Sequence, residues 1–442
     1  MSQKFNKKFM KIIYTLILLV CMALSTQAQS YTSYFTGDTA DVNPSPSSGI
    51  CLMGGATEDD SAMKWFLNKA NGGDVVVIRV TGADGYNNYF YTQLGVNINS
   101  VETLVIPSVA AANDPYVRKQ LRNAEAVWIA GGNQANYINF WNNTSVDTAL
   151  NDLINVKQGV IGGTSAGMAV QGQAYYSALN NSVTSAATLA NPYNSDVTIG
   201  YNDFLDNPKM KGIITDTHFD NPDRKGRFVG FIARCVKDYN KHFIGIACDE
   251  YTAVCIGSDM LARVYGGHPT YDDNAYFVVP DSCINGGIYQ PETCISGQPL
   301  TWNHNNQAIR VYAVKGTPNG SNHFDMNTKK TGVGGTWKNW YVNSGNFTEG
   351  SLPTPPCAPN GLSEIETESL VKLTPNPAGD VILIQVQSQK TNHAYSILDY
   401  LGRTIATNIF QGPTCRIDLS LLDEGLYFVQ VDGQIQKMIK SK

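Results

Sequence analysis

Residues 159–167 read Gly-Val-Ile-Gly-Gly-Thr-Ser-Ala-Gly, an apolar run that ends in a Gly-x-Ser-x-Gly pentapeptide. This run predicts a buried strand that ends in a tight turn, and the stretch Met168 to Ser177 after it is compatible with a helix. A strand, Gly-x-Ser-x-Gly and a helix are the setting of a nucleophile elbow, which lifts a serine hydroxyl clear of the sheet. Because strand and helix pack closely there, small neighbours are required, and both glycines and Ala166 supply them.

The sequence on either side alternates short apolar runs with amphipathic stretches, from Ile50 to about Val314. Helical spacing of apolar residues occurs in Ser61–Asn71 and in Asp114–Asn123. Strands are expected at residues 74–80, 101–106, 126–130 and 159–163. Strands separated by helices predict an α/β fold with a mostly parallel sheet flanked by helices. In such sheets, sites gather where strands end and glycine turns begin.

The composition describes a globular protein with room for more than one domain. The chain has 442 residues, of which 43% are hydrophobic and 16% charged. That length suits a catalytic domain with an accessory piece. A net charge of -5 and scattered basic residues provide no electrostatic footprint for nucleic acid, so nucleic-acid binding is not expected.

The first 28 residues have the features of an export signal. Lysines precede an apolar core from Ile12 to Leu24, and Ser25 to Ala28 supply a small-residue cleavage site. A membrane anchor is the alternative, but an apolar core of about 13 residues is too short to span a bilayer. A lipoprotein is disfavoured because Val20 stands where a small residue should precede Cys21. We therefore expect residues 1–28 to be a signal peptide and the protein to be exported through the periplasm.

If the protein is exported, its cysteines lie in an oxidising compartment, except for Cys21, which is removed with the signal peptide. Cys283 and Cys294 flank a short loop and are the most plausible disulfide pair, although connectivity cannot be read from sequence. No Cys-x-x-Cys occurs and no histidine pair has metal-ligand spacing. Neither a metal nor any other cofactor is expected.

The amino-acid composition and its periodicity change in the C-terminal part of the chain. Residues 29–350 would form the main domain, and prolines then predict a stiff linker over residues 351–366. Residues 367–442 alternate apolar and polar positions between turn signals, which predicts a small β-sandwich. A sugar-binding sandwich is one interpretation of that module.

The module also resembles the C-terminal sorting domain of the type IX secretion system of Bacteroidota. The matching residues are Pro375-Asn376-Pro377-Ala378, Asp399 to Arg403, Ile417 to Ser420, Gly425-Leu426-Tyr427 and the terminal lysines. The resemblance implies contact with the secretion machinery and passage across the outer membrane. The protein would then be released or attached to the cell surface, with or without removal of the module.

A serine nucleophile at Ser165 needs a base, and His218 is the best placed of the six histidines. It directly follows the predicted strand 212–217, where strand ends line a site. The acid of a triad orients the imidazole and stabilises its charged form. The strand 243–248 runs into Asp249 and Glu250, so either carboxylate is a candidate.

Residues 48–315 resemble the cyanophycinase and aspartyl dipeptidase group, peptidase family S51. Five motifs occur in the family's order: Met53-Gly54-Gly55 with residues 62–67, Gly131-Gly132-Asn133-Gln134, the elbow 163–167, the segment 216–219 and the strand 245–253. The resemblance implies a flavodoxin-like, class I glutamine amidotransferase-like fold.

By this resemblance Ser165 is the nucleophile, His218 the general base and Glu250 the third triad member. Asp196 stays in reserve, because the dipeptidase branch takes its acid from between the serine and the histidine. The remaining roles fall to Gly132 and Ala166 as oxyanion donors and to Gln134, Asp216, Arg224 and Arg227 as the substrate pocket. Arginine suits acidic substrates because its planar fork binds carboxylates bidentately.

The pocket residues depart from the family in several places. Asn133 replaces the usual Asp, Thr217 the usual Gln, and Pro222 an arginine. We therefore expect hydrolysis of a peptide or isopeptide bond beside an aspartate-type residue, with cyanophycin as only one candidate substrate. Two alternatives stay open: a catalytically inactive, surface-displayed binding protein, and an esterase or amidase for small substrates. The oligomeric state stays open too, with a homodimer as one option.

Overall fold

The computed structural model describes residues 29–281, 287–351, 371–386, 390–399, 402–432 and 434–441. The chain divides into two compact units at Cys357 and Ala358. The expected signal peptide, most of the expected linker and Cys283 lie outside the described residues. No helix in the described ranges is both long and apolar enough to cross a membrane.

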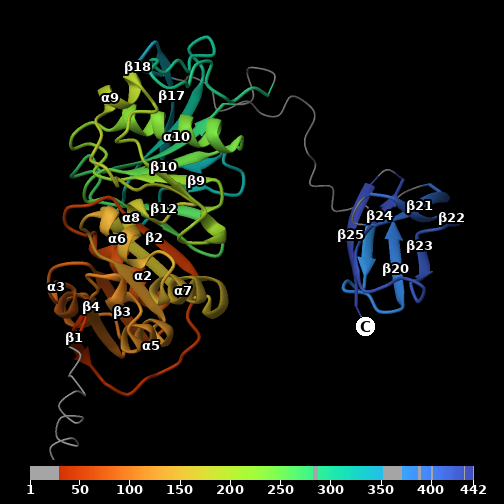
Figure 1. Cartoon of the computed structure of the whole chain (residues 1–442), viewed down its shortest axis with the longest axis horizontal. Helices are drawn as coiled ribbons and strands as arrows, with labels where there is room; N and C mark the ends of the chain where they lie inside the picture. Colours follow the sequence, from red (N-terminus) through yellow and green to blue (C-terminus); the bar gives the residue numbers. More distant parts are fainter. Residues whose placement is uncertain are drawn as a thin grey trace, which may run out of the picture. The chain divides into compact units, whose positions relative to one another are not determined.

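The larger unit contains two sheets with helices packed against them (Figure 1). The first sheet has the strand order β1-β4-β3-β5-β6-β2-β11-β12-β15-β16. Its strands are β1 (Thr32–Gly37), β2 (Gly49–Met53), β3 (Asp74–Arg79), β4 (Ser100–Val105), β5 (Ala126–Ile129), β6 (Val160–Thr164), β11 (Ala253–Ile256), β12 (Leu261–Tyr265), β15 (His323–Asp325) and β16 (Gly332–Val333). The five strands from β4 to β2 are parallel, which confirms the predicted α/β fold.

Helices cover both faces of this parallel core. On one face, α2 (Asp60–Lys69) packs its apolar residues against side chains of β2, β3 and β5. On the other face lie α5 (Pro115–Asn123), α6 (Gln134–Trp141) and α7 (Ser145–Asp152). Asp59 and Asp114 cap α2 and α5 by accepting backbone N–H groups of the first turn. Strands buried on both faces read as continuous apolar runs, which is why the sequence revealed them.

The second sheet has the order β18-β17-β14-β13-β10-β9-β7-β8. Its strands are β7 (Ala174–Tyr176), β8 (Ile199–Tyr201), β9 (Ile213–Asp216), β10 (Ile244–Cys248), β13 (Asn274–Pro280), β14 (Ile309–Lys315), β17 (Gly335–Asn343) and β18 (Asn346–Ser351). Strands β7, β9 and β10 are parallel, and the long α10 (Lys225–Tyr239) shares an apolar core with them. The remaining helices are α3 (Gly85–Asn88), α4 (Val109–Ala112), α8 (Ala166–Ala169) and α9 (Ser185–Ala190), with short turns at Tyr89–Gln93, Leu153–Lys157 and Pro208–Met210.

One sequence-based expectation fails in this unit. The helix expected over residues 168–177 is wrong, because α8 ends at Ala169 and the chain enters β7 instead. Gly172 lies in the turn between them, where a Cβ would approach the carbonyl oxygen of Ala174 to 2.3 Å. The stretch past residue 315, which shows little periodicity, forms β15 to β18 at the sheet edges.

The smaller unit is a β-sandwich of two antiparallel sheets, as the sequence predicted. One sheet has the order β19-β20-β23 and the other β22-β21-β24-β25. The strands are β19 (Val371–Thr374), β20 (Val381–Val386), β21 (Asn392–Asp399), β22 (Thr404–Gln411), β23 (Thr414–Asp418), β24 (Gly425–Val431) and β25 (Gln434–Lys440). Apolar side chains of both sheets form one core.

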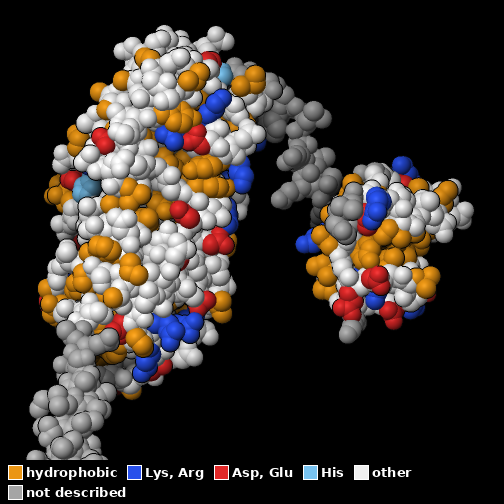
Figure 2. Space-filling view, in the orientation of Figure 1, with side chains coloured by type: hydrophobic (Ala, Val, Ile, Leu, Met, Phe, Trp, Pro, Cys, Tyr) orange, Lys and Arg blue, Asp and Glu red, His pale blue; other side chains and the backbone are white. Residues whose placement is uncertain are grey.

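Figure 2 shows that charged side chains on the visible face of the larger unit stand in small groups separated by uncharged surface. This agrees with the low charged fraction of 16%. A broad surface of one sign, as nucleic-acid binding needs, does not occur on that face.

Candidate active site

Ser165 lies between β6 and α8 with the backbone angles φ 53° and ψ -118°. A non-glycine residue in this region is strained, and the surrounding structure must hold it there. The Ser165 N–H donates to the Met53 carbonyl oxygen over 3.0 Å, which ties the turn to the end of β2. The strand and turn predicted from residues 159–167 therefore produce a raised serine at the end of a parallel strand.

The two glycines of the pentapeptide are required by close backbone contact. A Cβ on Gly163 would lie 2.6 Å from the carbonyl carbon of Gly167. A Cβ on Gly167 would lie 2.0 Å from the Ile129 carbonyl oxygen. No side chain fits either gap, so β6, β5 and α8 meet only because these positions are glycine.

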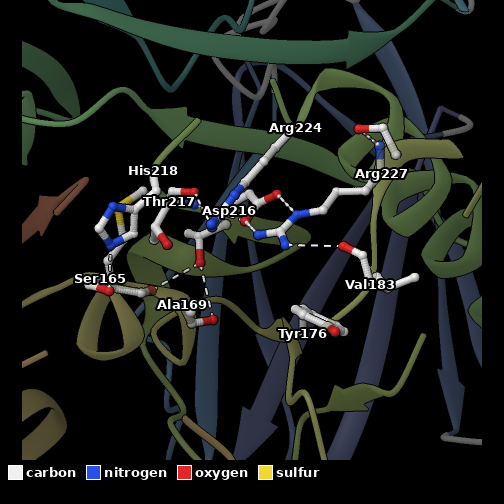
Figure 3. Close-up of polar contacts among 12 residues, drawn as sticks. Ser165, Ala169, Tyr176, Val183, Asp216, Thr217, His218, Arg224 and Arg227 are labelled. Atoms are coloured by element: carbon white, nitrogen blue, oxygen red, sulfur yellow. Dashed lines mark hydrogen bonds and ion pairs between the residues drawn. The ribbon is translucent and has the colours of Figure 1, made fainter. Parts of the chain in front are cut away.

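His218 connects Ser165 to the carboxylate of Glu250, and Figure 3 shows its imidazole beside Ser165. Its Nε2 lies 2.8 Å from Ser165 Oγ, and its Nδ1 lies 2.6 Å from Glu250 Oε1. His218 follows β9 directly, and its backbone N–H donates to the Gly54 carbonyl oxygen over 2.8 Å. Serine, histidine and glutamate thus come from the ends of three strands, β6, β9 and β10, and meet in one chain of hydrogen bonds.

Glu250 is held on more than one side. Asn221 Nδ2 lies 3.4 Å from Glu250 Oε2, and the Glu250 N–H donates to Asp220 Oδ1 over 2.9 Å. The hydrogen bond from His218 lowers the pKa of Glu250 below its usual value. An ionised carboxylate on Nδ1 fixes the tautomer in which Nε2 can accept the serine proton.

The other two acid candidates point elsewhere. Asp249 is buried and accepts a hydrogen bond from Asn274 Nδ2. Its burial raises the pKa of the carboxyl group to about 7. Its Oδ1 has no hydrogen-bond partner among the described residues. Asp196 accepts from Asn181 Nδ2 at 3.2 Å in a loop before β8. Glu250 is therefore the carboxylate that the fold brings to His218.

Sequence reasoning missed the residues that seat the imidazole and the carboxylate. Gly55 has φ +130°, and a Cβ there would lie 2.4 Å from His218 Cε1. Asn221 and Asp220 hold Glu250 as described above. The glycine pair after β2 was the available signal for Gly55, whereas nothing in the sequence linked Asn221 to a carboxylate 29 residues away.

A cavity of about 620 Å³ opens beside Ser165 and His218. Its walls include all the remaining predicted site residues: Gly132, Gln134, Ala166, Asp216, Arg224 and Arg227. Ala166 opens α8, and Gly131, next to Gly132, places its Cβ position 3.6 Å from Ser165 Cβ. These two segments therefore lie next to Ser165.

Two of the polar residues in the cavity wall neutralise each other. Arg227 Nε and Nη2 lie 2.9 and 2.5 Å from the two carboxylate oxygens of Asp216. The pair is buried, and Arg227 also donates to the Val183 carbonyl oxygen and lies 5.5 Å from the Tyr176 ring centre. Figure 3 shows this fork of Arg227 on Asp216. The pair shapes the wall without offering a free charge.

Arg224 is different, because it has no ion-pair partner in the described part of the chain. Its Nη1 donates to the Thr217 carbonyl oxygen over 2.9 Å, and its other donors remain available. Burial and the nearby Arg227 lower the pKa of Arg224, yet a guanidinium stays charged at neutral pH. The cavity therefore carries one unpaired positive charge.

No group of His, Cys, Asp and Glu in the described ranges has the arrangement of a metal site.

Comparisons with known proteins found two family-model matches and several similar solved structures. Residues 79–263 match the model of peptidase family S51, and residues 372–442 match that of the secretion system C-terminal sorting domain. No curated protein sequence matches the chain. A peptidase from an acI-B1 Actinobacterium has 13% sequence identity and a TM-score of 0.36, over 50% of this chain and 89% of that chain. A protein described as a peptidase E of Listeria monocytogenes EGD-e has 16% identity and a TM-score of 0.28, over 48% of this chain and 95% of that chain.

Ser165, His218 and Glu250 all fall inside the first matched segment, and β20 to β25 fall inside the second. Residues 79–263, which match the peptidase family S51 model, are therefore followed by residues 372–442, which match the secretion system C-terminal sorting domain.

Proposed function

We propose that the protein is an exported serine peptidase that cleaves peptide or isopeptide bonds beside an aspartate-type residue. The observation that carries this proposal is the hydrogen-bond chain Glu250–His218–Ser165, with distances of 2.6 and 2.8 Å. The family match supports a peptidase, and the sorting domain indicates export through type IX secretion to the cell surface or beyond.

The proposed reaction begins with attack of Ser165 Oγ on the scissile carbonyl carbon while His218 Nε2 takes the hydroxyl proton. Glu250 stabilises the imidazolium that forms. The N–H groups of Ala166 and Gly132 donate to the oxyanion of the tetrahedral intermediate. His218 then gives its proton to the leaving amine, the C–N bond breaks, and an acyl ester on Ser165 remains. Water, deprotonated by His218, hydrolyses the ester and regenerates the serine.

The substrate part of the proposal rests on Arg224. Its unpaired guanidinium stands in the same cavity as Ser165, and the carboxylate of Asp216 is already occupied by Arg227. A substrate carboxylate can form a charge-assisted hydrogen bond with Arg224. A substrate with a basic group in this cavity finds no free carboxylate there and meets a like charge. This charge pattern favours acidic substrates and makes an arginine-bearing polymer such as cyanophycin the less suitable candidate.

A fluorophosphonate probe tests the serine chemistry. We expect labelling of the folded full-length protein at one serine, and loss of labelling in Ser165→Ala. Ser182→Ala is the matched control, because Ser182 is an exposed serine of the same cavity without a contact to His218. Folded protein that takes up no label at any serine would contradict the hydrolase proposal and favour a binding protein on the same scaffold.

Product analysis then tests the substrate class. Peptides with Asp-X bonds, β-aspartyl peptides and β-Asp-Arg polymer are offered in parallel, together with a small ester and a small amide. We expect turnover of one of the two aspartyl peptide classes. Turnover of the small ester or amide alone would replace the peptidase proposal by an esterase or amidase.

A further inference from the structure

Cys51 and Cys255 face each other across two neighbouring strands. They are direct partners in the antiparallel register of β2 and β11. Their Sγ atoms lie 3.5 Å apart, and both side chains are fully buried. Both belong to the apolar cluster beneath α2, together with Met53 and Ala253 of the same two strands. The two thiols therefore point to the same face of the sheet and towards each other.

The backbone geometry at this pair suits a covalent bond. Directly opposite residues of antiparallel strands have Cα atoms about 4.5–5.5 Å apart, which falls within the range of disulfides, about 4.4–6.8 Å. A disulfide brings the sulfur atoms to about 2.05 Å, so they need to approach by roughly 1.5 Å. Rotation of the side chains accomplishes this without a change of strand pairing.

Among the described residues, the other buried cysteines lack such a partner. Cys235 lies within α10 and Cys294 in the loop after β13, and no thiol is within contact distance of either in the described residues. Cys248 approaches the Leu52 carbonyl oxygen at 3.8 Å and belongs to a different apolar cluster from Cys51. Only the pair on β2 and β11 combines close sulfur atoms with opposed backbone positions in the part of the chain that is described.

We propose that Cys51 and Cys255 form a disulfide in the exported protein. The inference rests on the export that the sorting domain indicates, and not on the peptidase chemistry of the proposed function. The two thiols lose two protons and two electrons as the S–S bond forms. The oxidant is the disulfide of a thiol-oxidising protein of the periplasm, which becomes a dithiol.

The bond forms before the sheet closes over the two residues. Burial raises the pKa of the Cys255 thiol far above its usual value, so the folded pair holds little of the thiolate that attacks a disulfide. The unfolded chain in the periplasm exposes both thiols and meets the oxidant there. Folding then covers the finished bond with α2 and shields it from reductants.

The position of the bond gives it a second consequence. The Gly54 N–H donates to the Thr252 carbonyl oxygen, and the Tyr251 N–H donates to that of Gly55, just beyond the paired cysteines. Gly54 and Gly55 contact His218, and Tyr251 follows Glu250. A bond between Cys51 and Cys255 therefore keeps together the two strand ends that support the histidine and the acid.

Thiol trapping of the full-length exported protein tests the proposal. The protein is unfolded in guanidinium with N-ethylmaleimide and without reductant, digested, and analysed by mass spectrometry. We expect a linked pair of peptides carrying Cys51 and Cys255, lighter by two hydrogens than the free peptides. Cys235 serves as the internal control and should carry the maleimide. Maleimide on both Cys51 and Cys255, or a link from Cys51 to Cys248, would overturn the proposal.

Thermal unfolding gives a second readout. We expect the exported protein that is unfolded and refolded with reductant to have a Tm about 5 °C or more below that of protein refolded without it, because the bond closes a very long loop in the unfolded chain. The double variant Cys51→Ala/Cys255→Ala should show no such dependence, whereas Cys235→Ala should keep it. An unchanged Tm on reduction of the unsubstituted protein counts against the bond. Ser165→Ala should keep the linked peptides, so this test is independent of whether the protein is a peptidase.

Discussion

The two sides of the cavity are built by different means. On the side of Ser165, neighbouring backbone leaves no room for a Cβ on Gly163 or Gly167, and the His218 imidazole leaves none on Gly55. On the side of Arg224, side chains and the exposed loop 178–182 form the wall. We call these the elbow side and the arginine side. In the proposed enzyme, the serine chemistry depends on sterically fixed backbone, whereas substrate choice depends on side chains that can be exchanged.

The largest expected effect is at the nucleophile. Ser165→Ala should lower kcat by about 10⁵-fold or more, with His218→Ala nearly as severe and the double variant no worse than either. This non-additivity follows if both residues act in one hydrogen-bonded unit. Steady-state kinetics on the best peptide substrate measures it. Effects that multiply in the double variant would contradict a shared role on the elbow side.

The next effect concerns the acid. Glu250→Gln should lower kcat by about 10³–10⁴-fold, because an amide no longer stabilises the imidazolium and permits the wrong tautomer. Asp249→Asn is the matched control, since it alters the adjacent carboxylate that does not contact His218. The kcat of that control should change less than threefold. Equal losses in both variants would remove Glu250 from its proposed role.

Gly55→Ala should displace the imidazole. Its Cβ would lie 2.4 Å from His218 Cε1, so the ring must move away from Ser165, and a shift of about 1 Å can lower kcat by about 10²-fold. Gly85→Ala is the control, because nothing lies within 4 Å of the Cβ position there. Full activity in Gly55→Ala would show that the elbow side tolerates more movement than its geometry indicates.

Arg224→Gln tests the role of the arginine side in substrate binding. It should raise KM for acidic substrates by about 10–100-fold, through loss of a charge-assisted hydrogen bond, while kcat changes little. Arg224→Lys should restore part of the affinity, and turnover of neutral substrates should be unaffected by either change. A fall in kcat with constant KM would assign Arg224 to the chemistry instead.

The smallest effect is on stability. Burial raises the pKa of Asp249 to about 7, whereas an unfolded Asp titrates near about 3.9. The folded state therefore binds more protons between these values, and the free energy of unfolding should fall as pH rises from about 4 to 7. Asp249→Asn should flatten this decline and be more stable than the parent at pH 8, by about 1–2 kcal/mol. Denaturant titrations at pH 5 and 8 measure the difference, and identical pH profiles would contradict it.

The sequence was most informative where burial dictates composition. The runs at β3, β4, β5 and β6 could be predicted because strands covered on both faces need uninterrupted apolar residues. The helix predicted over residues 168–177 was wrong because α8 has only four residues and a glycine turn follows it, so no periodic pattern marks the end of the helix. No strand was predicted for β15 to β18, because their positions at the sheet edges tolerate polar side chains.

The candidate site divides in the same way. Ser165 and His218 could be predicted because a pentapeptide and a strand end mark them locally. The choice between Asp249 and Glu250 could not be made from sequence, because adjacent residues point to opposite sides and only the fold shows which one meets His218. Asn221 and Gly55 were missed because their contacts join segments that are distant in the chain.

The pairing of β2 with β11 has a consequence for the order of events during export. Cys51 and its partner Cys255 are separated by 204 positions, so this pairing is a highly non-local contact. Folds that depend on such contacts form slowly, because much of the chain must be arranged before the contact stabilises it. Until β11 joins the sheet, the hydrogen bonds of Gly54 and Gly55 to Thr252 and Tyr251, which support His218 and Glu250, are not in place. Slow closure of the sheet would therefore delay assembly of the proposed triad until late in folding.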